Sequence, residues 1–172
     1  SAMLFFVIFG AQLFSGFINA ADLPGQTLNW IQGLSLSPSG ILAIILLFYI
    51  AFGCIFSAFA LVLLTVPVFY PLIAGLGLDV QFDTSPENVL IWFGIVIVVV
   101  AEIGQITPPI GMNVFVLKSM LPDVQLSTIF KGIVPFFGAD LVRLALIVSF
   151  PAIVLALPDF MDQIQDQFDA LM

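Results

Sequence analysis

Residues 40–78 form a long apolar stretch that contains no charged side chain. A straight helix of this length would measure about 60 Å, which is about twice the hydrocarbon thickness of a bilayer. The chain must therefore turn, and because no polar loop interrupts the stretch, we expect the turn at membrane depth. Charged residues make up 8% of the 172-residue chain, whereas soluble domains carry about 25%. The sequence predicts an all-α integral membrane protein.

The ionisable residues exclude several classes of function. Three basic residues stand against eleven acidic ones, and a nucleic-acid interface needs a basic patch. Histidine is absent, which removes histidine triads and histidine metal sites. Cys54 is the single cysteine, so an intrachain disulfide cannot form. We expect no enzyme, because an intramembrane hydrolase would need Glu102 and Asp140 in a motif that the chain lacks.

The weakest point of the apolar stretch is the Gly-Cys-Ile-Phe-Ser-Ala run at residues 53–58. A break there leaves residues 39–52 on one side, about 21 Å of helix, which is too short to span. We therefore predict a re-entrant hairpin over residues 39–78. Its turn must be buried in protein or line a water-filled cavity. Two tilted spans joined by a tight turn are the alternative.

A second break is predicted in the next apolar block. A Thr-Ser-Pro-Glu run starts a helix at residue 86, but a straight helix over residues 86–120 would be about 52 Å long. Pro108 and Pro109 remove backbone donors, and the residue before a proline avoids the helical region. The sequence therefore predicts a discontinuous helix made of residues 86–103 and 110–120.

The other segments complete a four-part organisation. Residues 1–36 should hold a transmembrane helix and a short interfacial helix over residues 26–34, for which a loop is the alternative. Residues 37–122 should hold the hairpin and the broken helix. Residues 123–158 should form a closing transmembrane helix that runs to about residue 157 and can bend at Pro135 and Pro151. Residues 159–172 predict an acidic amphipathic helix on the membrane surface, with Phe160, Ile164, Phe168 and Leu171 on its apolar stripe. The N-terminus lacks a Met start and a basic n-region, so we interpret the chain as a piece of a longer protein.

A few charged and capping residues refine this organisation. Lys118 and Lys131 favour a cytoplasmic loop between them, so the hairpin should open outward. Ser127 and the following threonine can cap the closing helix. Asp140 and Arg143 lie three apart on one helix face and are expected to neutralise each other.

Polar residues gather at the two predicted breaks. A hairpin followed by a broken helix is the arrangement with which ion-coupled transporters bind Na⁺ or an anionic substrate at the bilayer midplane, and hard cations prefer oxygen ligands. Close helix packing by small residues is the structural alternative. The candidates are Gly53 and Ser57 at the hairpin turn, and Gly104, Thr107 and Asn113, with Gln105 nearby, on the broken helix.

Glu102 is the one acid in this block beyond its cap, about one turn before the break. A carboxylate is costly inside a membrane and therefore marks a candidate functional residue. It can be an ion ligand, a proton carrier or a partner that holds the break. A structural hydrogen bond inside the bundle is the alternative.

Residues 104–116, with the sequence GQITPPIGMNVFV, strongly resemble the GxxTPPxGxNxF signature of the large membrane subunit of TRAP (tripartite ATP-independent periplasmic) transporters. Residues 53–71 resemble the proline-rich hairpin of that family, and residues 131–158 resemble its closing helix. The likeness covers nearly the whole chain, but only the C-terminal repeat of that subunit. Many members carry an acid followed by Ser or Thr near the hairpin turn, whereas residues 57–59 here are Ser-Ala-Phe.

This resemblance implies one inverted repeat of an elevator-type secondary transporter in the bacterial inner membrane. Residues 37–122 would form half of a mobile transport domain, and residues 1–36 part of the scaffold. A periplasmic binding protein would deliver a small organic acid, a small membrane subunit would complete the scaffold, and the N-terminal repeat would supply the rest of the site.

The same resemblance implies sodium as the coupling ion, with no further cofactor. The implied sodium ligands are Gly53, Ser57, Gly104, Thr107 and Asn113. Apart from the resemblance, the candidates for substrate binding or coupling are Glu102, Gln105, Pro108 and Pro109. A dicarboxylate carrier or ion antiporter that works without a binding protein remains an alternative, as does a membrane scaffold subunit that transports nothing.

Overall fold

The computed structural model describes residues 2–33 and 37–169, and their secondary structure is entirely helical. By length and composition, α6 and α8 can cross a membrane, whereas α3 and α4 are shorter apolar helices. The all-helical fold predicted from the sequence is therefore confirmed for the described residues, and α6 and α8 are consistent with an integral membrane protein. The helices are α1 (Ala2–Ala20), α2 (Leu23–Gly33), α3 (Pro38–Gly53), α4 (Ala58–Ala74), α5 (Leu78–Phe82), α6 (Pro86–Ile106), α7 (Met112–Met120), α8 (Leu126–Ser149) and α9 (Ala152–Asp169).

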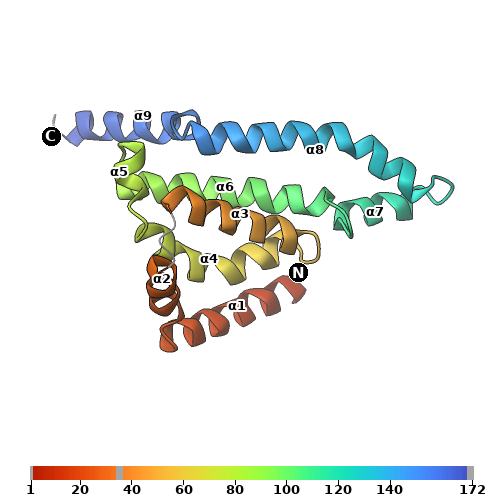
Figure 1. The fold of residues 1–172 in the computed structure, drawn as a ribbon, viewed down its shortest axis with the longest axis horizontal. Helices are drawn as coiled ribbons and strands as arrows, with labels where there is room; N and C mark the ends of the chain where they lie inside the picture. Colours follow the sequence, from red (N-terminus) through yellow and green to blue (C-terminus); the bar gives the residue numbers. More distant parts are fainter. Residues whose placement is uncertain (1, 34–36, 170–172) are drawn as a thin grey trace.

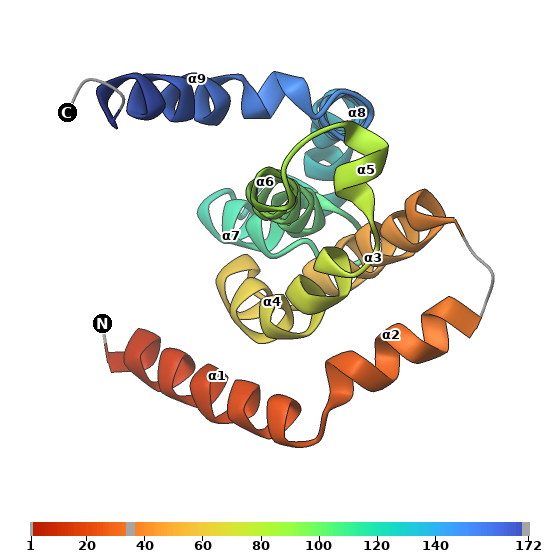
Figure 2. The ribbon, with the colours of Figure 1, turned by 90° about the vertical axis from the view of Figure 1, so that its left-hand side faces the viewer.

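Helix α6 is the centre of the fold. The helices α3 and α4 pack against it on one side and α8 on the other (Figure 1). Trp92, Val96 and Val100 of α6 are fully buried in this core. The pair α1 and α2 lies outermost and contacts the other elements mainly through α4 (Figure 2).

The hairpin forms where the sequence predicted it, with its turn between two helices capped by serine. Ser37 accepts a hydrogen bond from the Gly40 N–H at the start of α3, and Ser57 accepts one from Ala60 at the start of α4. Residues 54–57, which we name the hairpin turn, separate the two arms. The hydroxyl groups of Tyr49 and Thr65 hydrogen-bond across the arms. The depth of the turn in the membrane stays a prediction.

The broken helix also forms, but its break lies slightly later than predicted. Helix α6 continues to Ile106, three residues past the expected end, and α7 begins at Met112. Proline disfavours the helical region for the residue directly before it, which is Thr107 in front of Pro108. Thr107 accordingly has φ −85° and ψ 134°. Gly111 has a φ of +54°, which glycine adopts without steric cost. We name residues 107–111 the helix break.

Two expectations for the closing helix are wrong. Its N-cap is Gln125 and not Ser127 or its neighbour, and no side chain caps it. The helix ends at Ser149 instead of about residue 157, because Phe150, the residue before Pro151, leaves the helical region with φ −129° and ψ 76°. After this interruption α9 runs through Pro158 to Asp169, so the end of the closing helix and the acidic tail form one helix.

A hydrogen bond from α6 fixes this interruption. Pro151 has no N–H, so the carbonyl of Ile147 has no donor from its own helix. The indole N–H of the buried Trp92 donates to that carbonyl at 2.9 Å. The end of α8 is thus held against the first half of α6.

Three smaller expectations can be compared with the structure. The interfacial segment is helical and begins at Leu23 rather than at residue 26, and residues 34–36 lie outside the described residues. Asp140 and Arg143 form the expected ion pair at 3.0 Å. In the tail helix, Phe160 and Ile164 are exposed. The last residue of the predicted apolar stripe, at position 171, is not described.

Candidate functional site

The two breaks in the helical structure meet each other. Gly53 at the end of α3 and Gly104 in α6 are both buried, and their backbones are in contact. A Cβ atom added at Gly104 would lie 2.6 Å from the Cα of Gly53. Only glycine at both positions allows this approach, which brings the hairpin turn onto the end of α6.

The side chain of Gln105 links the same two regions. Its amide nitrogen donates to the carbonyl of Phe56 at 2.8 Å and to that of Gly53 at 3.3 Å. Gln105 is 8% exposed. Gly53 directly precedes the hairpin turn and Phe56 lies within it. The hydrogen-bond ladder of α3 has ended there, so carbonyls need other donors.

Cys54 adds a contact that we did not predict from the sequence. Its buried thiol donates to the Ile50 carbonyl at 3.1 Å and lies 3.6 Å from the Pro108 carbonyl in the helix break. A carbonyl oxygen of the break therefore faces the hairpin turn. The position of Cys54 directly after Gly53 predicts this contact only when the contact between Gly53 and Gly104 is already known.

The two hydroxyl candidates are occupied locally, yet they keep acceptor capacity. Thr107 donates its hydroxyl hydrogen to the Ile103 carbonyl at 2.6 Å. Ser57 accepts from the Ala60 N–H at 3.3 Å. A hydroxyl oxygen has two lone pairs, so both oxygens can still contribute to a cation site.

Two candidates lie away from the contact between the glycines. Asn113 is exposed in the first turn of α7, and among the described residues no hydrogen bond joins it to Thr107 or to the hairpin turn. Pro109 is exposed within the helix break. The structure thus brings Gly53, Gly104 and Gln105 together and leaves Asn113 and Pro109 at the surface.

Glu102 is exposed beside the hairpin rather than at the break. It lines a cavity of about 360 Å³ between α4 and α6. The other lining side chains are apolar. The cavity also borders the first turn of α4, and the N-terminus of a helix favours negative charge. They are Ala58, Phe59, Val62, Val98 and Ala101.

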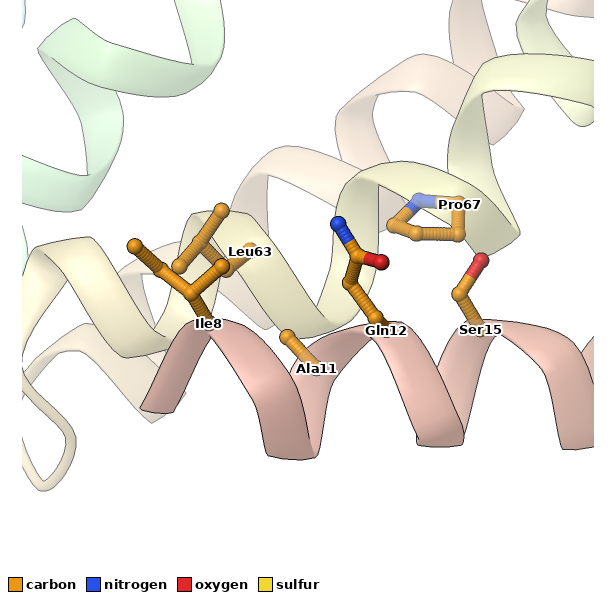
Figure 3. A pocket seen from close by; sticks show the side chains of 6 residues that line it. All are labelled: Ile8, Ala11, Gln12, Ser15, Leu63 and Pro67. Atoms are coloured by element: carbon orange, nitrogen blue, oxygen red, sulfur yellow. The ribbon is translucent and has the colours of Figure 1, made fainter. Parts of the chain in front are cut away.

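A further cavity, of about 330 Å³, lies between α1 and α4 (Figure 3). The side chains of Gln12 and Ser15 point from α1 toward Pro67 of α4. Pro67 cannot donate to the carbonyl of Leu63, another lining residue, so polar groups are present on both sides of this cavity. The sequence contained the polar residues, but their common cavity depends on tertiary packing.

The composition of the site limits what it can bind. Among the described residues, no cluster of three or more His, Cys, Asp or Glu could hold a metal ion. A cation at the hairpin turn would have carbonyl and hydroxyl oxygens as its ligands. Neutral oxygens suit a monovalent hard cation better than Ca²⁺, which usually takes several carboxylates.

Comparison with known proteins gives one consistent result. A family model described as the DctM component of the tripartite ATP-independent periplasmic transporter matches residues 1–153. The chain is similar to the C4-dicarboxylate TRAP transporter large permease protein DctM of Pseudomonas aeruginosa, with 32% identity over 92% of this chain and 35% of the relative. It is also similar to the ectoine TRAP transporter large permease protein TeaC of Halomonas elongata, with 32% identity over 92% of this chain and 35% of that protein.

A third relative is more distant. The sialic acid TRAP transporter large permease protein SiaM of Vibrio cholerae is 28% identical over 92% of this chain and 35% of that relative. The chain therefore spans about a third of the length of these curated relatives. No solved structure matches it.

Proposed function

Because this chain belongs to the family of DctM components of tripartite ATP-independent periplasmic transporters, we propose that it is part of a large permease subunit that imports a small organic acid by sodium-coupled transport. Two of the relatives are named for C4-dicarboxylates and for sialic acid, which supports an acid as the cargo. A third is named for ectoine. The relatives are permease proteins, which favours a role without catalysis.

The contact between the hairpin turn and the helix break carries this proposal. Backbone irregularity at membrane depth is tolerated where it is buried in protein or lines a cavity. Here the carbonyls of Gly53 and Phe56 share the amide of Gln105, and the Pro108 carbonyl lies 3.6 Å from the Cys54 thiol of the same turn. Such a collection of neutral oxygens supports a sodium site more directly than a proton pathway, which needs a titratable relay.

The arrangement of the helices supports a division into two moving parts. The pair α1 and α2 contacts the other elements mainly through α4, whereas α3, α4 and α6 pack closely together. We assign α1 and α2 to a scaffold and the hairpin with the broken helix to the mobile domain of an elevator. The N-terminal repeat would complete the substrate site.

The full transporter would need two further components. A small membrane subunit would extend the scaffold in the bacterial inner membrane, and a periplasmic binding protein would deliver the substrate. A carrier that works without a binding protein is the competing function, since it could use the same hairpin and break. The names of the relatives favour the tripartite system.

Reconstitution tests the proposal. The full-length permease and its small subunit are placed in proteoliposomes, and uptake of labelled C4-dicarboxylates and sialic acid is measured with and without the cognate binding protein. We expect uptake that requires both an inward sodium gradient and the binding protein. Uptake without the binding protein would favour the competing carrier, and uptake driven equally well by a proton gradient in sodium-free buffer would overturn sodium coupling.

A further inference from the structure

We propose that Gln105 is a positioning residue that fixes the hairpin turn against α6 and keeps Cys54 of that turn buried. Its donors are already used within the protein. The amide nitrogen carries two hydrogens, and it donates to Phe56 and Gly53. The buried side chain therefore orients the backbone around the site and has no free donor for a substrate.

The hairpin turn needs an external donor. The backbone N–H groups of Ile55 and Phe56 donate to the Phe52 carbonyl, and the N–H of Leu61 donates to the Ser57 carbonyl. The Phe56 carbonyl receives the Gln105 amide at 2.8 Å, the shorter of its two bonds. A carbonyl without a donor is costly away from water, so removal of this amide should favour states in which the turn opens to solvent.

The neighbouring contact makes the closed turn sensitive to small shifts. Gly53 lies against Gly104, the residue that precedes Gln105. Cys54 follows Gly53 and is 3% exposed. Any movement of the turn away from α6 therefore exposes the Cys54 thiol, which makes this cysteine a reporter of the position of the turn.

Thiol labelling tests the inference without reference to transport. The full-length permease is prepared in proteoliposomes with cysteines outside this chain replaced, and the rate of Cys54 modification by a small maleimide is measured. Gln105→Leu should raise the rate about tenfold, the change expected from losing a buried hydrogen bond. Gln125→Leu is the matched control, because Gln125 is exposed and makes no capping bond. Equal rates in the two variants would overturn the inference.

A second variant separates positioning from general loss of structure. In Gln105→Glu an ionised carboxylate cannot donate to a carbonyl, whereas the protonated acid can donate to one. Labelling of this variant, measured relative to the wild type at each pH, should therefore fall as the pH is lowered. Gln105→Leu should show no such recovery. Loss of packing alone predicts the same pH profile for both variants, and that result would contradict a positioning role.

The consequence for transport rests on the proposed function. A loosened turn should weaken ion binding at the Gly53 and Ser57 oxygens, so Gln105→Leu should raise the sodium concentration for half-maximal uptake while the maximal rate is largely kept. If labelling responds and the sodium dependence does not, the positioning role stands and the sodium assignment fails. If neither responds, the positioning role fails.

Discussion

Helix α6 donates side-chain hydrogen bonds to backbone carbonyls of other segments both near its start and near its end, and the surroundings of these two contacts differ. Near its start, Trp92 donates to the Ile147 carbonyl that Pro151 leaves without a partner. Near its end, Gln105 donates to the carbonyls around the hairpin turn. Both contacts supply a donor to backbone carbonyls at places where a regular helix ends.

The Trp92 contact uses one donor for one acceptor, in a core of large apolar side chains. Trp92 is 0% exposed and packs edge-on against Phe82 at 4.9 Å. The Gln105 contact lies beside the touching backbones of Gly53 and Gly104. Each carbonyl oxygen there keeps a second lone pair after accepting one hydrogen bond. A helix interruption is therefore not in itself a site; the chemistry around it decides between a structural and a binding role.

The largest expected effect is at the glycine contact. Gly104→Ala places a Cβ against the backbone of Gly53, which cannot rotate away, and overpacking of this kind costs about 1–3 kcal/mol. We expect a lower unfolding temperature and loss of uptake. Gly94→Ala in the same helix is the control, because nothing lies within 4 Å of its added Cβ. Equal stability and uptake in the two variants would show that the breaks do not touch.

The next effect is purely structural. Trp92→Phe leaves the Ile147 carbonyl without a donor, which should lower the free energy of unfolding by about 1–3 kcal/mol. The sodium dependence of uptake should stay unchanged. In a Pro151→Ala background the backbone N–H at position 151 can supply the bond, so the same substitution should cost less. A double-mutant cycle on the purified permease measures this, and an equal cost in both backgrounds would contradict the assignment of the bond.

The glycines and prolines explain how much of this could be predicted. The hairpin turn and the helix break were located within three residues of their observed positions, because Gly53 and Pro108 act on the local backbone. The presence of a proline does not by itself determine where a helix ends, however. Helix α4 continues through Pro67 and Pro71, whereas α8 ends before Pro151.

The bonds of Trp92 and Gln105 could not be predicted, since each joins residues about 50 positions apart and depends on how the helices pack. The same reason explains Asn113. Its place in the signature suggested a shared ligand set with Thr107, but its surface position follows from the direction that α7 takes after the break.

A smaller effect distinguishes the candidate ligands from each other. Thr107→Val keeps the shape of the side chain and removes the hydroxyl, so the sodium concentration for half-maximal uptake should rise about tenfold, or about 1.4 kcal/mol. Asn113→Ala should shift it less, because Asn113 is exposed and lies apart from the hairpin turn. Uptake against sodium concentration in proteoliposomes gives both values. A larger shift for Asn113 would move the ion site toward α7.

The smallest effect is expected at Glu102, which lies outside both contacts of α6. Its carboxylate is exposed on the wall of the cavity next to α4, and none of the hydrogen bonds in the described residues ties it to the hairpin turn. Glu102→Gln keeps the size of the side chain and removes its charge. If the neutral oxygens at the turn bind the coupling ion, sodium-dependent uptake should persist with a rate within about twofold of the wild type, a difference of less than about 0.5 kcal/mol. Glu87→Gln, an exposed acid at the start of the same helix, is the control.

A proton carrier behaves differently: its neutralisation would abolish uptake, and the wild type would then accept a proton gradient in sodium-free buffer. That pair of results would make Glu102 the coupling residue and leave the oxygens around Gly53 with a structural role like that of the Trp92 contact.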